Sequence, residues 1–234
     1  ATSDLEFHNL SDTIQQVILA DNSVVTVYPN STLTYPAQFA DDTRKVSLIG
    51  KAFFDIAKDT IHPFIVNSEN IVIRVLGTSF LINADSPLGV AEVEVRTGRV
   101  EVLKKTFKAD DKGNTVVVTP NQKVVYTVKD DNLTKTLVDA PMQLIEAYSP
   151  RMKDLTPHTF IYKGQRLTAI FAELEKVYGI QIIVANKAVE SCVFTGNLAG
   201  EDLFTKLQIL GVATQTSYKT QGTDIIIDGK GCSN

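Results

Sequence analysis

Apolar and polar residues alternate with a period of two through much of the first 138 residues, and this alternation constrains the fold more than any other feature. The clearest case is the segment 93–96 (VEVR), which is followed by Thr97-Gly98 and then by 100–102 (VEV). Because successive side chains of a strand point to opposite faces, this pattern predicts an antiparallel hairpin with one buried face. Similar short segments recur with turn residues between them, which predicts an all-β region.

The number and spacing of these segments indicate the fold class of the region. No stretch of ten residues before position 138 shows the spacing of a helix. Many short strands at this spacing are typical of a sandwich, a jelly roll or a β-solenoid, and the pattern does not choose among the three. We therefore expect a mainly β N-terminal domain over residues 1–138.

A different composition follows this region. Residues 139–157 carry three prolines and mixed charges, which predicts a linker, although residues 142–148 could form one or two helical turns. The prolines are Pro141, Pro150 and Pro157.

The last part of the chain shows helical periodicity. Apolar residues recur at spacings of three and four between Leu167 and Tyr178, and Gly179 follows where a left-handed cap belongs. A second helix is expected over residues 201–210, with Gly211 as its cap. Short strands flank both helices in the order β-α-β-β-α-β-β. This order predicts a small α+β domain with a doubled βαβ topology over residues 158–234.

Charge and motif content exclude several classes of function. The 234 residues include 23 Lys and Arg against 27 Asp and Glu, a net charge of −4, which disfavours nucleic-acid binding. No apolar run approaches the roughly 20 residues of a membrane span. The three histidines lie far apart, and the two cysteines form no CxxC pair. We therefore expect no catalytic residues, no cofactor-binding residues, no metal site and no enzymatic activity.

Several blocks of the sequence resemble one known family, in a fixed order. The N-terminal region resembles FecR-type anti-sigma factors in five blocks: 17–36 (VILADNSVVTVYPNSTLTYP), 44–56 (RKVSLIGKAFFDI), 63–66 (PFIV), 75–80 (VLGTSF) and 93–102 (VEVRTGRVEV). Two positions depart from the family pattern: Lys51 stands where Glu is usual and Asn22 where Gly is usual. Asn tolerates the left-handed turn conformation, so the first turn survives.

The C-terminal region resembles the small domain that ends many of these proteins. The resemblance lies in Phe160, in the helix that ends at Tyr178, in Cys192 and in the terminal segment 225–232 (IIIDGKGC). This domain is similar to the signalling (STN) domain at the N-terminus of TonB-dependent receptors and to secretin N-terminal domains.

The resemblance implies a function in signal relay. FecR-type proteins sit in the inner membrane, and a cytoplasmic segment, absent from this sequence, holds an extracytoplasmic-function sigma factor. Their periplasmic part senses the signalling domain of a TonB-dependent outer-membrane transducer. We therefore expect this chain to be the periplasmic sensor part of such a regulator, membrane-anchored in its full-length form.

Two sets of site residues follow from this expectation. In an oxidising periplasm, Cys192 and Cys232 should form a disulfide, because both lie in the same small domain. The terminal hairpin around Ser217, Tyr218 and Lys219 is the expected partner-binding edge, because a last strand often lies at a sheet edge and can accept a strand from another protein.

Two other classes of function remain open. The chain could be a glycan-binding β module with an accessory domain, although an aromatic content of 8% and the lack of Trp disfavour sugar platforms. It could also be an enzyme of the jelly-roll type, but metal-dependent jelly rolls need clustered His ligands, which this sequence does not provide.

Overall fold

A computed structural model describes residues 4–84, 89–105, 114–144 and 159–232 of the chain. The chain divides into two compact units, Ala1–Lys135 and Thr136–Asn234, which we call the N-terminal and C-terminal domains. Most of the expected linker, including residues 145–148 of its possible helical turns, lies outside the described residues.

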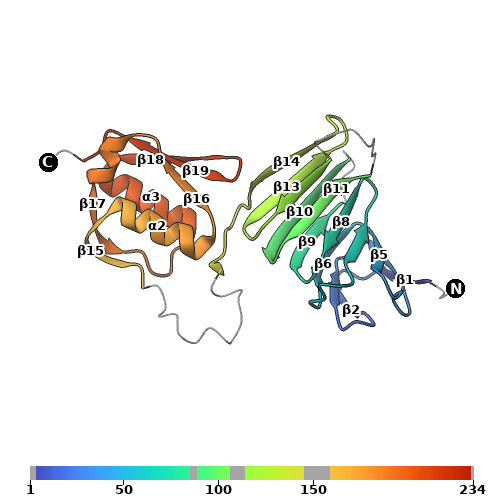
Figure 1. The fold of residues 1–234 in the computed structure, drawn as a ribbon. Helices are drawn as coiled ribbons and strands as arrows, with labels where there is room; N and C mark the ends of the chain where they lie inside the picture. Colours follow the sequence, from blue (N-terminus) through green and yellow to red (C-terminus); the bar gives the residue numbers. More distant parts are fainter. Residues whose placement is uncertain (1–3, 85–88, 106–113, 145–158, 233–234) are drawn as a thin grey trace. The chain divides into compact units, whose positions relative to one another are not determined.

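The N-terminal domain consists of two seven-stranded sheets (Figure 1). The first contains, in spatial order, β1 (Asp4–Asn9), β4 (Ser31–Pro36), β5 (Arg44–Ile49), β7 (Phe64–Asn67), β8 (Ile71–Val75), β11 (Val100–Lys104) and β12 (Thr115–Val118). The second contains β14 (Asn132–Leu137), β13 (Gln122–Thr127), β10 (Val90–Thr97), β9 (Ser79–Asn83), β6 (Lys51–Asp55), β3 (Val24–Val27) and β2 (Gln15–Ile18). The last two residues of β14 already belong to the C-terminal domain.

Strand order in both sheets follows the order of the chain. The chain passes from one sheet to the other and back, and each passage adds one or two strands next to those already in that sheet. The colours in Figure 1 therefore progress steadily along the domain. Among the neighbouring strands from β1 to β13, all pairs are antiparallel except β5 and β7, which are parallel. The predicted fold class is confirmed, and of the three architectures left open the domain adopts a sandwich.

The core of the sandwich lies between the two sheets. Along β5, Val46 and Leu48 are buried while Lys45 is exposed, as the period of two requires. Phe54 of β6 stacks on Phe80 of the same sheet at 5.2 Å between ring centroids, and it meets the edge of Phe64 in the other sheet at 6.4 Å. Full burial of each such ring contributes roughly 2 kcal/mol, so these aromatic residues hold the two sheets together.

The C-terminal domain has the α+β composition and the order of helices and strands predicted for it. Its elements are β15 (Ile161–Arg166), α2 (Leu167–Tyr178), β16 (Gln181–Val184), the 3₁₀ turn η1 (Lys187–Ser191), β17 (Val193–Asn197), α3 (Leu203–Thr214), β18 (Thr216–Gln221) and β19 (Asp224–Gly229). The strands divide into a β15-β17 pair and a three-stranded sheet in the order β16-β19-β18.

The two helices end differently. α2 ends at Tyr178, and Gly179 adopts the predicted left-handed conformation with φ of 63°. The prediction that Gly211 caps the second helix was wrong, because α3 continues to Thr214 and Gln215 takes the left-handed position. A Cβ atom on Gly211 would lie 2.6 Å from the carbonyl oxygen of Thr216, so the glycine lets the start of β18 approach the helix.

Candidate functional site

Strand β18 forms one edge of the three-stranded sheet, and its only neighbour among the described strands is β19. Tyr218 pairs with the buried Ile227, which places its side chain on the face that packs against the helices. Ser217 and Lys219 are exposed on the opposite face. The three candidate residues therefore share one edge strand, but they point to both faces of the sheet.

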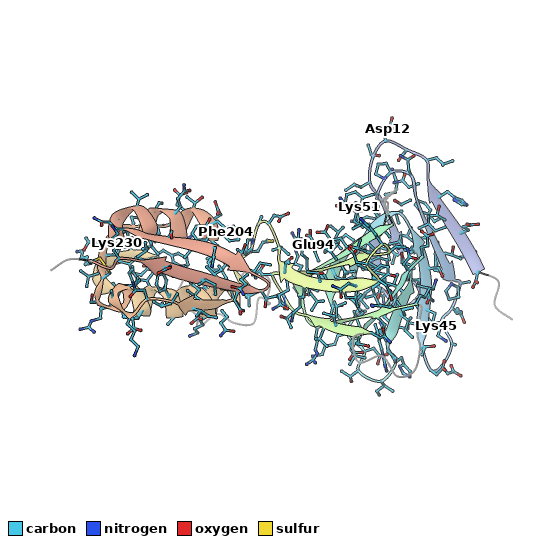
Figure 2. The ribbon with its side chains drawn as sticks, turned by 90° about the horizontal axis from the view of Figure 1, so that it is seen from above. Asp12, Lys45, Lys51, Glu94, Phe204 and Lys230 are labelled. Carbon is cyan, nitrogen blue, oxygen red and sulfur yellow. A yellow bond between two sulfur atoms is a disulfide. The ribbon has the colours of Figure 1, made fainter. Side chains whose placement is uncertain are left out.

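A groove runs along this edge within the C-terminal domain. The ring of Tyr218 stacks on Phe204 of α3 with centroids 5.9 Å apart and planes 12° apart. Beside these rings lies a pocket of ≈ 400 Å³, whose other walls are residues 136–139, Thr220 and Gly222. We call this pocket the β18 groove; Phe204 is labelled in Figure 2.

Residues 136–139 form the far wall of the β18 groove. The backbone N–H of Leu137 donates a hydrogen bond to the carbonyl oxygen of Gly222 at 3.2 Å, which fixes this wall at the β18–β19 turn. Leu137 is buried in the core of the C-terminal domain, and Val138 is also buried. The groove thus lies next to a strand edge and has a mixed lining, with the two aromatic rings and Val138 beside Thr136, Asp139 and Thr220.

Helix α3 holds Phe204 in place through its first turn. The Asp202 carboxylate accepts hydrogen bonds from the backbone N–H of Thr205 at 3.0 Å and from its hydroxyl at 2.6 Å. These bonds stabilise the charged form and lower the pKa of Asp202 below its ordinary value. The cap therefore fixes the start of the helix two residues before Phe204.

A buried lysine anchors the same helix. Lys206 lies 4.5 Å above the ring of Phe160, and its Nζ donates to the carbonyl oxygen of Glu201. Burial disfavours the charged ammonium group and lowers the pKa of Lys206. The contact ties α3 to the residue that precedes β15.

The two cysteines are bonded to each other in the structure. Cys192 is buried just before β17, and Cys232 follows β19, with their Cα atoms 5.2 Å apart. The bond therefore links the end of the chain to the other small sheet.

Other kinds of site are not found in the described part of the chain. No group of three His, Cys, Asp or Glu residues there is arranged to hold a metal ion. None of the helices in that part is long and apolar enough to cross a membrane.

An arrangement of this kind can bind an extended segment of another protein. The backbone N–H and C=O groups on the open side of β18 can pair with an added strand. Alternate side chains of that strand would enter the β18 groove, while those between them would lie beside Ser217 and Lys219.

Comparison with known proteins assigns both domains to one family. Residues 10–101 match the model of the FecR protein family, and residues 159–227 match the model named FecR, C-terminal. Together the two matches cover more than half of the chain. The chain belongs to the FecR family. No curated protein gives a significant match to it.

Two crystal structures share the fold of this FecR-family chain. Both are of a candidate anti-sigma factor from Parabacteroides distasonis ATCC 8503. The first is 23% identical, with a TM-score of 0.54, and the match covers 97% of this chain and all of the other. The second is also 23% identical, with a TM-score of 0.53 and coverage of 95% and 98%. At this identity the match shows a common fold, which includes both FecR domains.

Phe204 and residues 136–139 are parts of the site that the sequence did not reveal. Leu203, Leu207 and Leu210 form the apolar stripe of α3, and Phe204 lies beside that stripe. The only sequence signal for Phe204 was therefore an aromatic residue outside the stripe. Residues 136–139 gave no signal, because only the tertiary fold brings them to β18.

Proposed function

We propose that this FecR-family chain is the sensor part of an anti-sigma regulator and that it acts by protein–protein binding rather than by chemistry. Family membership supports the regulatory function, and the two structures with the same fold carry the name of an anti-sigma factor. In the full regulator, a segment outside this sequence would hold an extracytoplasmic-function sigma factor.

The signal in this proposal comes from a TonB-dependent transducer. Its signalling domain is the partner that the FecR resemblance implies, and we propose that the STN-like C-terminal domain receives it. The observation that carries this proposal is the open edge of β18 next to a groove whose wall contains the stacked rings of Phe204 and Tyr218. A periplasmic location agrees with the disulfide, because disulfides persist in oxidising compartments.

Calorimetric titration of the chain with the signalling domain of the TonB-dependent receptor encoded beside it tests the proposal. We expect saturable one-to-one binding. Tyr218→Ala should weaken it at least about tenfold, which corresponds to about 1.4 kcal/mol, because the variant removes one wall of the groove.

A matched control separates loss of the site from loss of the fold. Val193 is exposed on β17, in the other small sheet, and Val193→Ala should leave the affinity unchanged. Circular dichroism should show the same fold for both variants. Absence of binding by the unmodified chain would contradict the proposed relay. An equal loss of affinity in Tyr218→Ala and Val193→Ala would contradict binding at β18.

A further inference from the structure

The open edge of β18 carries a single charge. Lys219 is the only charged residue of the strand (TSYKTQ), and it is exposed on the face of the sheet opposite the helices. Its cross-strand neighbour on β19 is Ile226, which is half-buried and has no polar side-chain group. Among the described residues, Lys219 has no ion-pair partner. Its ammonium group is therefore available to a strand that adds to this edge.

The acidic residues of the same face lie to either side of this charge. Asp224 pairs with Gln221 and Asp228 pairs with Ser217, so both carboxylates are diagonal to Lys219 rather than opposite it. Diagonal neighbours on one face of a sheet lie roughly 7–8 Å apart, whereas directly opposite residues lie roughly 5 Å apart. A residue of an added strand opposite Lys219 would thus be closer to it than either carboxylate.

The face toward the helices sets a second requirement on such a strand. Tyr218 and Thr220 both line the β18 groove, in which the rings of Tyr218 and Phe204 stack. Successive side chains of a strand point to opposite faces, so the two neighbours of the residue opposite Lys219 would point toward the groove. Apolar side chains at these two positions would cover the rings and remove apolar surface from water.

We propose that β18 selects a partner strand in which an acidic residue lies between two apolar residues. The acidic side chain faces Lys219, and the two apolar side chains enter the β18 groove. The same charge disfavours a basic strand and a second copy of β18, because each would bring another cation onto this face. This inference rests on the proposed function, since it specifies the partner segment that binds at β18.

Amide NMR titration of the full chain with two synthetic peptides tests this proposal. The probes are acetyl-TSTLELTST-amide, the Glu peptide, and acetyl-TSTLKLTST-amide, the Lys peptide. The Glu peptide should cause saturable shifts in the amides of residues 216–221 at millimolar concentration. The Lys peptide should bind at least about threefold more weakly, because like charges directly opposite each other destabilise a strand pair. Added salt should reduce this preference, since the charges are exposed to solvent.

Reversal of the charge at position 219 gives the sharpest comparison. Lys219→Glu should invert the preference, so that the Lys peptide binds at least about threefold more tightly than the Glu peptide. Lys163 provides the matched control, because it is also exposed on a strand but lies on β15, in the other small sheet. Lys163→Glu makes the same change in net charge and should keep the preference for the Glu peptide. Circular dichroism should show the same fold for both variants.

Three results would overturn the proposal. These are the absence of saturable binding by either peptide, equal affinity for the two peptides, and the same change of preference in Lys219→Glu and Lys163→Glu. Failure of the proposed function would look different. If the peptides are discriminated as expected but the transducer's signalling domain does not bind, the relay is contradicted and the selection by Lys219 stands. Binding of the signalling domain without discrimination between the peptides has the reverse meaning.

Discussion

Arg44 is buried where three segments of the N-terminal domain meet, and its hydrogen bonds and ion pair join them. Arg44→Met would leave the Asp21 carboxylate without its cation and the carbonyl groups of Ala57 and His62 without its donors. Removing one partner of a buried ion pair costs about 3–5 kcal/mol. We expect a loss of about 3 kcal/mol in the free energy of unfolding, measured by urea denaturation.

Lys45→Met is the control for this variant. Lys45, labelled in Figure 2, is the next residue of β5 and is exposed, so its replacement should change stability by no more than about 0.5 kcal/mol. Equal destabilisation by both variants would contradict the role assigned to the Arg44 network.

The Asp202 cap gives α3 a pH-dependent stability. The pKa of Asp202 is lowered in the folded state, so its stabilisation is full above the ordinary carboxyl pKa and is lost as the pH falls through the lower, folded-state pKa. Asp202→Ala should cost about 1 kcal/mol at neutral pH, and the difference from the unmodified chain should shrink near pH 2.

Urea denaturation at both pH values checks this prediction. Asp202→Asn is the control, because asparagine also caps helices but does not titrate. Its stability relative to Asp202→Ala should be independent of pH. A difference between the unmodified chain and Asp202→Ala that persists unchanged near pH 2 would show that the charge of Asp202 is not what stabilises α3.

At the scale of elements, the β10–β11 hairpin depends on a glycine. Gly98 has a φ of 78°, and a Cβ atom on it would lie 2.4 Å from Cγ2 of Thr78. Gly98→Ala should therefore combine backbone strain with a clash and cost about 2–3 kcal/mol in thermal or urea unfolding.

Gly164 separates the two causes. Its φ is 59°, but a Cβ atom added to it would have no described atom within 4 Å beyond Gly164 and its two chain neighbours, so Gly164→Ala should cost only the backbone strain of about 1 kcal/mol. If Gly98→Ala costs no more than Gly164→Ala, the contact with Thr78 does not constrain the hairpin.

Some helices and strands could be predicted from sequence patterns and others could not. The β10–β11 hairpin and α2 were predicted because each has a strong period and a glycine at the required turn or cap. Strands β1, β4 and β14 were not predicted. β1 is mostly exposed, β4 ends in a proline and β14 is largely polar, so none shows the long apolar alternation of a central strand.

At the scale of the whole molecule, the disulfide should affect one domain only. Cys192 and Cys232 are 40 residues apart, and closing a loop of that size stabilises a fold by about 4 kcal/mol in the chain-entropy model. Reduction with dithiothreitol, or the variant Cys232→Ser, should lower the unfolding temperature of the C-terminal domain and leave that of the N-terminal domain unchanged. Scanning calorimetry measures both transitions, and a shift of both would contradict this assignment.

Only part of the candidate site could be predicted from the sequence. The last hairpin predicted an edge strand, and β18 is one, so Tyr218 could be named in advance. Its direction toward the helices, its stacking on Phe204 and the wall formed by residues 136–139 depend on contacts between distant segments. Local periodicity carries no information about such contacts.

Binding of the partner at the open edge of β18 is central to the proposed relay, and hydrogen exchange tests it most directly. Amide exchange of the chain should be measured with and without the transducer's signalling domain. We predict new protection in residues 216–221, with none at β16, the opposite edge of the same sheet. Protection confined to β16 or to the N-terminal domain would contradict binding at β18.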